Sequence, residues 1–272
     1  MSARLGKFMR GVWVPLVIVM AWEALSRGGL VSAIALPPPS AVLVKWIQYL
    51  QPVKAYDPTE GSYFAWLFSG ELPQDAFSSL SRVVMGYAIG VALALPLGIF
   101  MGAYKRVYDL CNPLVQFLRP IPPSAYIPLA ILWFGLGSPP SVFLIFIAAF
   151  FPVLMNTIAG VRHVDGIFLR AARNLGAGEG TIFWRVMLPA ATPYILAGMR
   201  VGIGTAFILV IISELIAVNA GLGYRIMEAR EFMWSDKVIA GMFSIGLLGL
   251  AIDTGMSRLN NFLLRWHRGL EQ

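Results

Sequence analysis

The stretch LRAARNLGAGEGTIFWRVMLPAATP, from Leu169 to Pro193, interrupts a chain that is otherwise mostly apolar. It is basic, and glycines punctuate its middle part. Because glycine after a helical run favours a helix end, we expect a helix up to Leu175, a break at Gly176 and a short helix over Glu179 to Met187. The Leu188 to Pro189 pair is then expected to stop the short helix before the next apolar run.

The short helix has an apolar edge. Ile182, Phe183 and Val186 follow each other at i, i+1 and i+4, which places them on one side of a helix. The whole connection, residues 162–189, is far longer than a turn needs and too short for a domain. An apolar edge outside lipid fits a groove on another protein, so we expect this connection to dock to a partner.

Composition indicates the solvent in which the chain folds. Hydrophobic residues make up 58% of the 272 residues and charged residues 13%, with a mean hydropathy of +0.72. Several apolar runs approach the roughly 20 residues that span a bilayer as a helix, and they lack the alternation of barrel strands. We therefore predict an all-α integral membrane protein. The six predicted spans are Gly11 to Ser26, Phe77 to Ala103, Leu114 to Gly135, Val142 to Val161, Tyr194 to Asn219 and Val238 to Met256.

The first run follows Arg4, Lys7 and Arg10 and therefore also has the form of a signal peptide. We expect a retained span instead. The single cysteine, Cys111, permits no disulfide within the chain and is expected to be a buried thiol.

The charges predict an orientation. If both termini are cytoplasmic, the inside segments carry 12 basic and 4 acidic residues, and the outside segments carry 6 basic and 7 acidic ones. Basic residues sort to the cytoplasmic side of membrane proteins. The net charge of +7 is thus a signal of topology, and we do not expect nucleic-acid binding.

The longest outside segment, residues 31–75, contains a predicted interfacial helix. Ser40 after three prolines is expected to cap its N-terminus. The apolar side of this helix is predicted to hold Val42, Leu43, Trp46, Ile47, Tyr49 and Leu50. The segment could form a lid over the outer helix ends or contact a partner outside the membrane.

The sequence contains no pattern for catalysis, metal binding or ATP binding. Gly6 and Lys7 precede Phe8 and lack the glycine context of a phosphate loop. His163 and His267 are isolated, and Ser213 has no histidine partner at its membrane depth. We expect a chain that performs no chemistry and binds no cofactor or metal.

Charges within the predicted spans are costly in lipid and therefore informative. They are Glu23, Arg82, Arg119, Arg200, Glu214 and Asp253, three of each sign. Mutual pairing would stabilise helix packing, whereas unpaired charges would line a polar path. Arg119 is the most suggestive, since the prolines that follow it disturb the helical hydrogen bonds and leave backbone groups that prefer a cavity. Gly198 and Gly202 form a G-x-x-x-G pair that permits close helix approach.

The opening stretch resembles a known family. Two alanines, three residues, a glycine and then an apolar helix ending in leucine and proline are similar to the cytoplasmic loop of inner-membrane permeases of binding-protein-dependent ABC importers. The pattern is carried by Ala171, Ala172, Gly176, Leu188 and Pro189. In that family the loop is a coupling helix that fits a cleft on the ATPase subunit. The family pattern commonly begins with glutamate, where this chain has Arg170.

The resemblance covers nearly the whole chain. The segments LPPPSAV, FLRPIPPSAYIPLAILWFGLG (Phe117 to Gly137), SELIA (Ser213 to Ala217) and GLG (Gly221 to Gly223) are similar to the nitrate, taurine, aliphatic sulfonate and bicarbonate branch, with WFGLG nearer to taurine and sulfonate members. The resemblance implies a type I ABC importer permease fold, in one transmembrane domain over residues 1–272.

The resemblance also implies a function. The chain would pass a small anionic solute across the bacterial inner membrane by alternating access, as a homodimer in contact with membrane lipid. A solute-binding protein would deliver the solute, and two ATPase subunits would bind ATP and magnesium. The residues expected to couple to the ATPase are Arg170, Ala171, Ala172, Gly176, Glu179, Ile182, Phe183, Val186, Leu188 and Pro189. The residues expected on the translocation path are Arg119, Pro122, Arg200 and Glu214.

A membrane scaffold without transport is one alternative, although the proline-broken third span would be an odd feature there. An ion-coupled secondary carrier or channel is the other. Its intramembrane acids would serve as a coupling-ion site, but sequence halves with matching interrupted helices are not apparent.

Overall fold

The computed structural model describes residues 2–32, 34–57 and 62–265, and for residues 2–12 and Ala65 it describes the backbone alone. His267 lies outside the described residues. The contacts divide the chain into two compact units, Met1–Phe77 with Ala220–Gly246, and Ser78–Asn219 with Leu247–Gln272. Helices α4 (Glu71–Ala103) and α12 (Ser235–Leu263) contribute residues to both units.

The first unit contains the predicted interfacial helix. Its complete helices are α1 (Ser2–Arg27), α2 (Pro39–Leu50), α3 (Tyr63–Leu67) and α11 (Leu222–Glu231). The expected Ser40 cap is wrong, because Pro38 is the N-cap and Pro39 occupies the first helical position. Ser40 instead donates its N–H and its hydroxyl to the Glu23 carboxylate, at 3.1 and 2.8 Å. The Glu23 carboxylate of α1 therefore accepts a backbone N–H that the first turn of α2 leaves without a partner in the helix.

The apolar residues of α2 divide between two faces. Val42 and Tyr49 are buried, and Trp46 donates its indole N–H to the Ser244 hydroxyl at 2.8 Å. The predicted apolar side is therefore only partly a packing face. The remaining members are exposed, namely Leu43, Ile47 and Leu50.

Helix α11, which we did not predict, is held by an acidic cluster. Arg225 donates to the Asp75 and Glu228 carboxylates, each at 2.8 Å, and Asp75 also accepts the Gly221 N–H. Burial alone would lower the pKa of Arg225, but the hydrogen bond and charge of Asp75, with those of its acidic neighbours, raise it above the ordinary value. Arg225 therefore stays charged.

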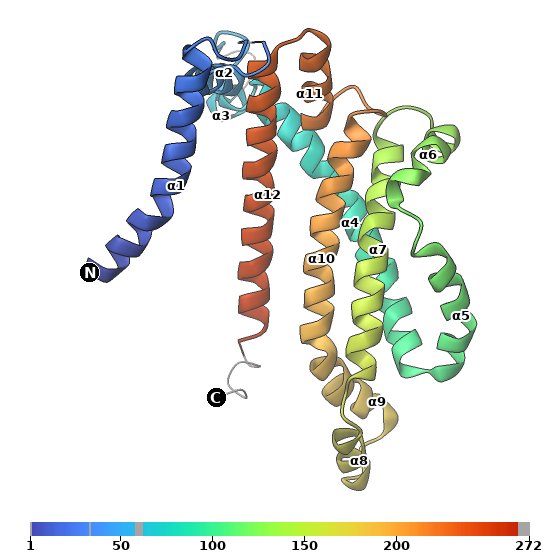
Figure 1. Ribbon diagram of the computed structural model, residues 1–272. Helices are drawn as coiled ribbons and strands as arrows, with labels where there is room; N and C mark the ends of the chain where they lie inside the picture. The colour runs from blue at the N-terminus through green and yellow to red at the C-terminus, as the bar shows by residue number, and fades with distance from the viewer. Residues whose placement is uncertain (1, 33, 58–61, 266–272) are drawn as a thin grey trace. The chain divides into compact units, whose positions relative to one another are not determined.

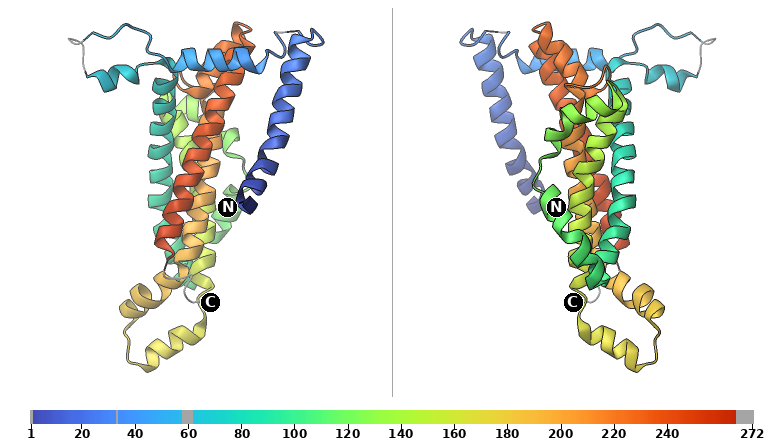
Figure 2. Two further views of the ribbon diagram at one scale, coloured as in Figure 1. Left: turned by 90° about the vertical axis from the view of Figure 1, so that its left-hand side faces the viewer. Right: turned by 90° about the vertical axis from the view of Figure 1, so that its right-hand side faces the viewer.

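The second unit is a bundle of long helices with a protruding end. In Figures 1 and 2, α7 and α10 run side by side, and α8 and α9 extend beyond their ends. Besides its parts of α4 and α12, this unit contains α5 (Lys105–Leu118), η1 (Pro123–Tyr126), α6 (Ile127–Phe134), α7 (Ser138–Arg162), α8 (Gly166–Asn174), α9 (Glu179–Ile182), the π-helical turn η2 (Phe183–Met187) and α10 (Leu188–Glu214).

Within the described residues, four helical stretches are long and apolar enough to cross a membrane. They are α4, α7, α12 and the continuous stretch Glu179–Glu214. The predicted first span lies within α1, which is not among these four stretches. The predicted third span is wrong as a single helix, because α5 ends at Leu118 and α6 begins only at Ile127. The prolines between them remove backbone donors and break the helix.

Glycines bring α4 and α10 into close contact with α7. A Cβ added at Gly86 of α4 would lie 2.7 Å from the Val142 carbonyl oxygen of α7, and one at Gly198 of α10 would lie 2.5 Å from Asn156 Cβ. The predicted G-x-x-x-G pair is thus used inside the chain, because Gly202 also faces α7. Such close backbone approach stabilises helix pairs in a bilayer.

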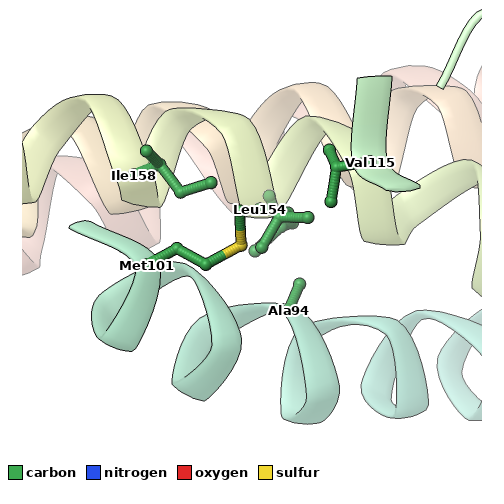
Figure 3. Packing of buried hydrophobic residues seen from close by; sticks show 6 residues of the cluster. Ala94, Met101, Val115, Leu154 and Ile158 are labelled. Atoms are coloured by element: carbon green, nitrogen blue, oxygen red, sulfur yellow. The ribbon is translucent and has the colours of Figure 1, made fainter. Parts of the chain in front are cut away.

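Apolar side chains fill the remaining space between these helices. Figure 3 shows Ala94 and Met101 of α4 pointing toward Leu154 and Ile158 of α7, with Val115 of α5 completing the cluster. All five are at most 7% exposed, so this part of α5 is held in the bundle although the helix is too short to span it.

Replacing Gly198 by alanine tests the close contact. Because the added methyl group meets α7, we expect Gly198→Ala to lower the unfolding free energy by about 1–3 kcal/mol. Gly204 lies on the same helix, and a methyl group added there would meet no atom within 4 Å, so Gly204→Ala is the matched control. Thermal unfolding in detergent measures both variants, and equal melting temperatures would contradict the packing argument.

Candidate functional site

The predicted docking connection, residues 162–189, contains a part here called the coupling segment (residues 165–189), which begins with a capped helix. The Asp165 side chain caps α8 by accepting the Ile167 N–H at 2.8 Å. The helix ends as predicted, with Leu175 as its C-cap. Gly176 has a φ of +80°, and its N–H bonds to the Arg173 carbonyl at 2.9 Å.

A second hydrogen bond completes this helix end. The Ala177 N–H bonds to the Ala172 carbonyl at 3.0 Å. Together the two bonds form a Schellman motif, which requires a left-handed residue at the position of Gly176. The spacing of two alanines, three residues and a glycine therefore has a backbone cause, because it places a glycine where the helix must turn.

The second half of the coupling segment joins the membrane helix without a break. The expected stop at Leu188 and Pro189 is wrong, since α10 begins at Leu188. The Leu188 N–H bonds to the Phe183 carbonyl, five residues back, which makes a π turn. Proline within a helix leaves the carbonyl four residues earlier without its donor. Here the π turn ends directly before Pro189. The helix therefore continues through the proline into α10.

The apolar surface of the coupling segment differs from the predicted edge. Ile182 is only 2% exposed, and Phe183 and Val186 are half-buried, so these side chains support the segment from within. The exposed apolar side chains, here called the coupling surface, are Ile167, Phe168, Leu175 and Trp184. The helical periodicity located an apolar edge. It could not show that the residues of this edge pack against the rest of the chain while other apolar side chains are exposed.

Charges on the coupling segment lie at its surface. Arg173 pairs with Glu179 at 3.2 Å across the glycine turn, and both side chains are more than half exposed. Such a pair contributes at most about 1 kcal/mol. Arg170 is exposed and pairs with no acid in the described part of the chain.

Glu214, a predicted path residue, lies in a buried ion pair. Its carboxylate is fully buried and accepts from Arg82 at 2.6 Å and from the Ser79 hydroxyl at 2.8 Å. Arg82 also donates to the Ser138 hydroxyl at 3.0 Å. These residues connect α4, α7 and α10. Pairing for packing therefore describes Glu214 better than a position on a path.

Three further charges from the predicted spans are paired as well. Arg200 of α10 donates to both oxygens of Asp253 of α12, at 2.9 and 3.0 Å. Glu23 accepts from Arg27 and Ser40. Arg119, by contrast, is exposed and has no ion-pair partner within residues 2–32, 34–57 and 62–265.

Arg119 lines a groove in the second unit. The groove has a volume of about 410 Å³ and lies between the end of α5 and the helices α7 and α10. Its other walls are mainly apolar, with Asn156 and Thr205 as the polar exceptions. Pro122, Arg200 and Glu214 are not among its lining residues, but Ile121 and Pro123 are.

The two polar side chains of this groove, Asn156 and Thr205, already donate hydrogen bonds to backbone carbonyls. Pro152 in α7 has no N–H for the Ala148 carbonyl, and the Thr205 hydroxyl of α10 donates to that carbonyl at 2.8 Å. The Asn156 amide donates to the Pro152 carbonyl at 2.9 Å. Arg119 is therefore the group in the groove whose charge is not compensated.

The described residues bring no group of three or more histidine, cysteine, aspartate or glutamate side chains together for a metal ion. The site therefore consists of the groove with its single cation and the coupling surface with its exposed apolar side chains.

The helices and the groove define a multi-pass membrane transport subunit. Residues 94–268 match the family described as the inner membrane component of binding-protein-dependent transport systems. The chain belongs to this family and is a permease subunit of an ABC importer.

Two relatives are similar over most of the chain. The taurine transport system permease protein TauC of Escherichia coli is 35% identical over 92% of this chain and 87% of its own length. The nitrate import permease protein NrtB of Synechocystis is 31% identical over 69% of this chain and 68% of its own length.

Solved structures have the same fold. An inward-facing crystal structure of the MetNI methionine ABC transporter has a TM-score of 0.59 and covers 68% of this chain and 92% of its own. Its sequence is only 16% identical, so this likeness concerns the fold alone.

The buried ion pair can be tested by a double-mutant cycle. Arg82→Met or Glu214→Leu alone leaves a buried charge unpaired and should lower the unfolding free energy by about 3–5 kcal/mol, whereas the double variant should recover most of that loss. Arg173→Met breaks an exposed pair and is the control, with an expected loss of about 1 kcal/mol or less. Additive losses in the double variant would contradict the pairing.

The left-handed turn at Gly176 can be tested in the same way. Gly176→Val places a β-branched side chain at a φ of +80°, which costs roughly 1–2 kcal/mol, so backbone hydrogen exchange in α8 should become about tenfold faster. Gly180→Val is the control, because Gly180 has an ordinary φ and equally open surroundings. Unchanged exchange in Gly176→Val would show that the turn does not depend on glycine.

Proposed function

We propose that this permease carries a small oxyanion across the membrane along the Arg119 groove. The observation that supports this most is the charge pattern, because Arg119 alone among the charges predicted within the spans has no partner in the described residues. An uncompensated guanidinium at the edge of a mainly apolar groove attracts an anion, and apolar walls screen that attraction less than bulk water does. Arginine also binds planar or tetrahedral oxyanions through two parallel hydrogen bonds.

The names of the relatives support the same class of solute. Taurine carries a sulfonate group and nitrate is itself an oxyanion, and the permeases so named are similar to most of this chain. An oxyanion group is the chemistry that both solutes share. We therefore assign this chain to a small sulfonate-like, nitrate or bicarbonate solute.

We assign ATP hydrolysis to a separate subunit. The sequence contains no phosphate loop, so ATP and magnesium would be bound by an ATPase partner. The coupling surface would dock there, because Trp184, Phe168 and Leu175 are each more than half exposed on a segment that projects from the bundle (Figure 2). Arg170 would lie at the edge of that contact and contribute little affinity.

The continuous helix provides a mechanical link to the groove. Trp184 and the groove residue Thr205 lie on the same helical stretch, Glu179–Glu214, about 30 Å apart along its axis. When two ATPase subunits close on ATP, their motion would move this helix as a unit. The groove walls contributed by α10 would then shift against α7 and open the path to the other side.

The remaining partners follow from orientation and size. The basic residues favour cytoplasmic N- and C-termini in the bacterial inner membrane, and with that orientation the coupling segment would lie on the side of the ATPase. A solute-binding protein would deliver the solute from outside. The groove is not enclosed by this chain alone, so a second copy of the chain would complete the path.

Arg119→Gln tests this function. The purified permease would be assembled with its ATPase and binding protein in proteoliposomes, and uptake of labelled taurine and nitrate would be measured. We expect uptake to fall about tenfold or more, because the variant loses a charged hydrogen bond worth about 1.5–3 kcal/mol. Assembly and basal ATP hydrolysis should remain, since Arg119 makes no ion pair within the described chain.

Arg106→Gln is the matched control, because Arg106 is an exposed arginine at the start of the same helix and does not line the groove. Normal uptake by Arg119→Gln, or an equal loss in Arg106→Gln, would reject the groove as the path of the anion.

A further inference from the structure

A second polar pocket lies in the first unit, in residues that the proposed transport function does not use. It has a volume of about 240 Å³, which is several times the roughly 30 Å³ that one water molecule occupies. Its walls come from α2, the chain that follows α2, and the first residues of α4 and α12. The polar lining residues are Lys45, Gln48, Tyr49, Gln51, Glu71 and Lys237.

Lys237 is a largely buried cation with few partners. Its side chain is 18% exposed, and its ammonium lies 4.5 Å from the ring centres of both Tyr49 and Trp234. The nearest carboxylate oxygen, on Glu71, is 4.0 Å away, which is too far for a hydrogen bond. In the described part of the chain the ammonium donates no hydrogen bond. An ammonium has three donors, and burying them unsatisfied is costly.

A second donor in the same pocket lacks a partner. Tyr49 is 6% exposed, and its buried hydroxyl has no hydrogen-bond partner among the described residues. Burial, together with the charge of Glu71, raises the pKa of Tyr49, so the hydroxyl stays neutral and can donate. The other lysine, Lys45, is half-buried and has no ion-pair partner in the described chain.

Glu71 reduces the positive charge of the pocket but does not cancel it. Its carboxylate is shared, because it lies 3.9 Å from Arg225 and 4.0 Å from Lys237. Two ammonium groups and one shared carboxylate line the pocket itself, whereas the carboxylates of Glu228 and Asp236, which also act on Tyr49, are not among its lining residues. A cation would be repelled by both lysines, and water would satisfy the donors without balancing the charge.

We propose that the pocket of Lys45 and Lys237 binds an oxyanion group, such as a sulfonate or a phosphate. Two ammonium groups, the Tyr49 hydroxyl and the side-chain amides of Gln48 and Gln51 supply donors, and an oxyanion offers several acceptors to them. This site is distinct from the Arg119 groove, which consists of residues of the second unit. The proposed orientation places it outside the membrane, but binding itself does not depend on transport.

The oxyanion can come from two sources, a free anion or the phosphate of a lipid headgroup. Exposed apolar residues of α2, such as Val44 and Ile47, are compatible with contact to lipid beside the pocket. The free anion would be tested with labelled sulfate on delipidated permease in detergent, at constant ionic strength. The lipid would be tested by native mass spectrometry of permease in phosphatidylglycerol nanodiscs. This experiment measures how much lipid remains bound to the permease after it is released from the nanodisc.

The variants are Lys45→Gln and Lys237→Gln. Lys237 lies over the rings of Tyr49 and Trp234, whereas Lys45 has no ion-pair partner in the described chain, so the Lys45 variant keeps the test valid if Lys237→Gln fails to fold. Lys54→Gln is the control, because Lys54 is an exposed lysine outside this pocket. We expect each pocket variant to weaken binding about tenfold, equivalent to about 1.4 kcal/mol, and the control to bind like the unmodified protein.

Sulfate binding that depends on both lysines would support a free anion, and lipid retention with the same dependence would support a headgroup. The site would be overturned if neither sulfate binding nor lipid retention depended on the two lysines, or if Lys54→Gln lost binding equally. The proposed transport function would survive that failure, because uptake through the Arg119 groove is measured separately.

Discussion

The close approach of α4 and α10 to α7 is the constraint on which the second unit depends. Lipid tails are as apolar as leucine, so helices in a bilayer are held by close packing and hydrogen bonds between them. Glycine makes the packing possible, since a Cβ at Gly86 or Gly198 would fall within 2.7 or 2.5 Å of α7. The buried pair of Arg82 and Glu214 and the groove beside Arg119 are both formed by helices that these contacts position.

Several polar groups within the bundle follow one rule, in which a group on a neighbouring helix satisfies them. Glu214 is satisfied by Arg82, and the Ala148 carbonyl left free by Pro152 accepts from Thr205. Each of these interactions joins two helices, so satisfying the group also determines how the helices pack. Arg119 departs from the rule, since it has no ion-pair partner in the described chain. Because the other charges of the predicted spans are paired, an unpaired arginine beside a groove has a physical reason to meet a charged solute.

The coupling segment has two features with different causes. Its turn requires a residue in the left-handed backbone region, and its surface consists of exposed apolar side chains. Gly176 permits the end of α8, and the π turn before Pro189 lets the second half continue into α10. A motion applied at Trp184 therefore acts on one unbroken helix. If Leu188 and Pro189 had ended the helix, as their residue types favour, a flexible joint would separate the coupling surface from the groove.

Local patterns in the sequence determined most of the helices and the turn at Gly176, because hydrophobic length and backbone conformation depend on neighbouring residues alone. They also showed equal numbers of positive and negative charges within the predicted spans, but left open whether these charges pair or line a path. They could not identify Arg82 as the partner of Glu214, which lies 132 residues away, nor show that Ile182 is buried while Trp184 is exposed. Those facts depend on which helices meet and on which face they do so. Only the tertiary structure decides which helix faces meet. A helical repeat tells on which side of its helix a residue lies, but not which helix packs against that side.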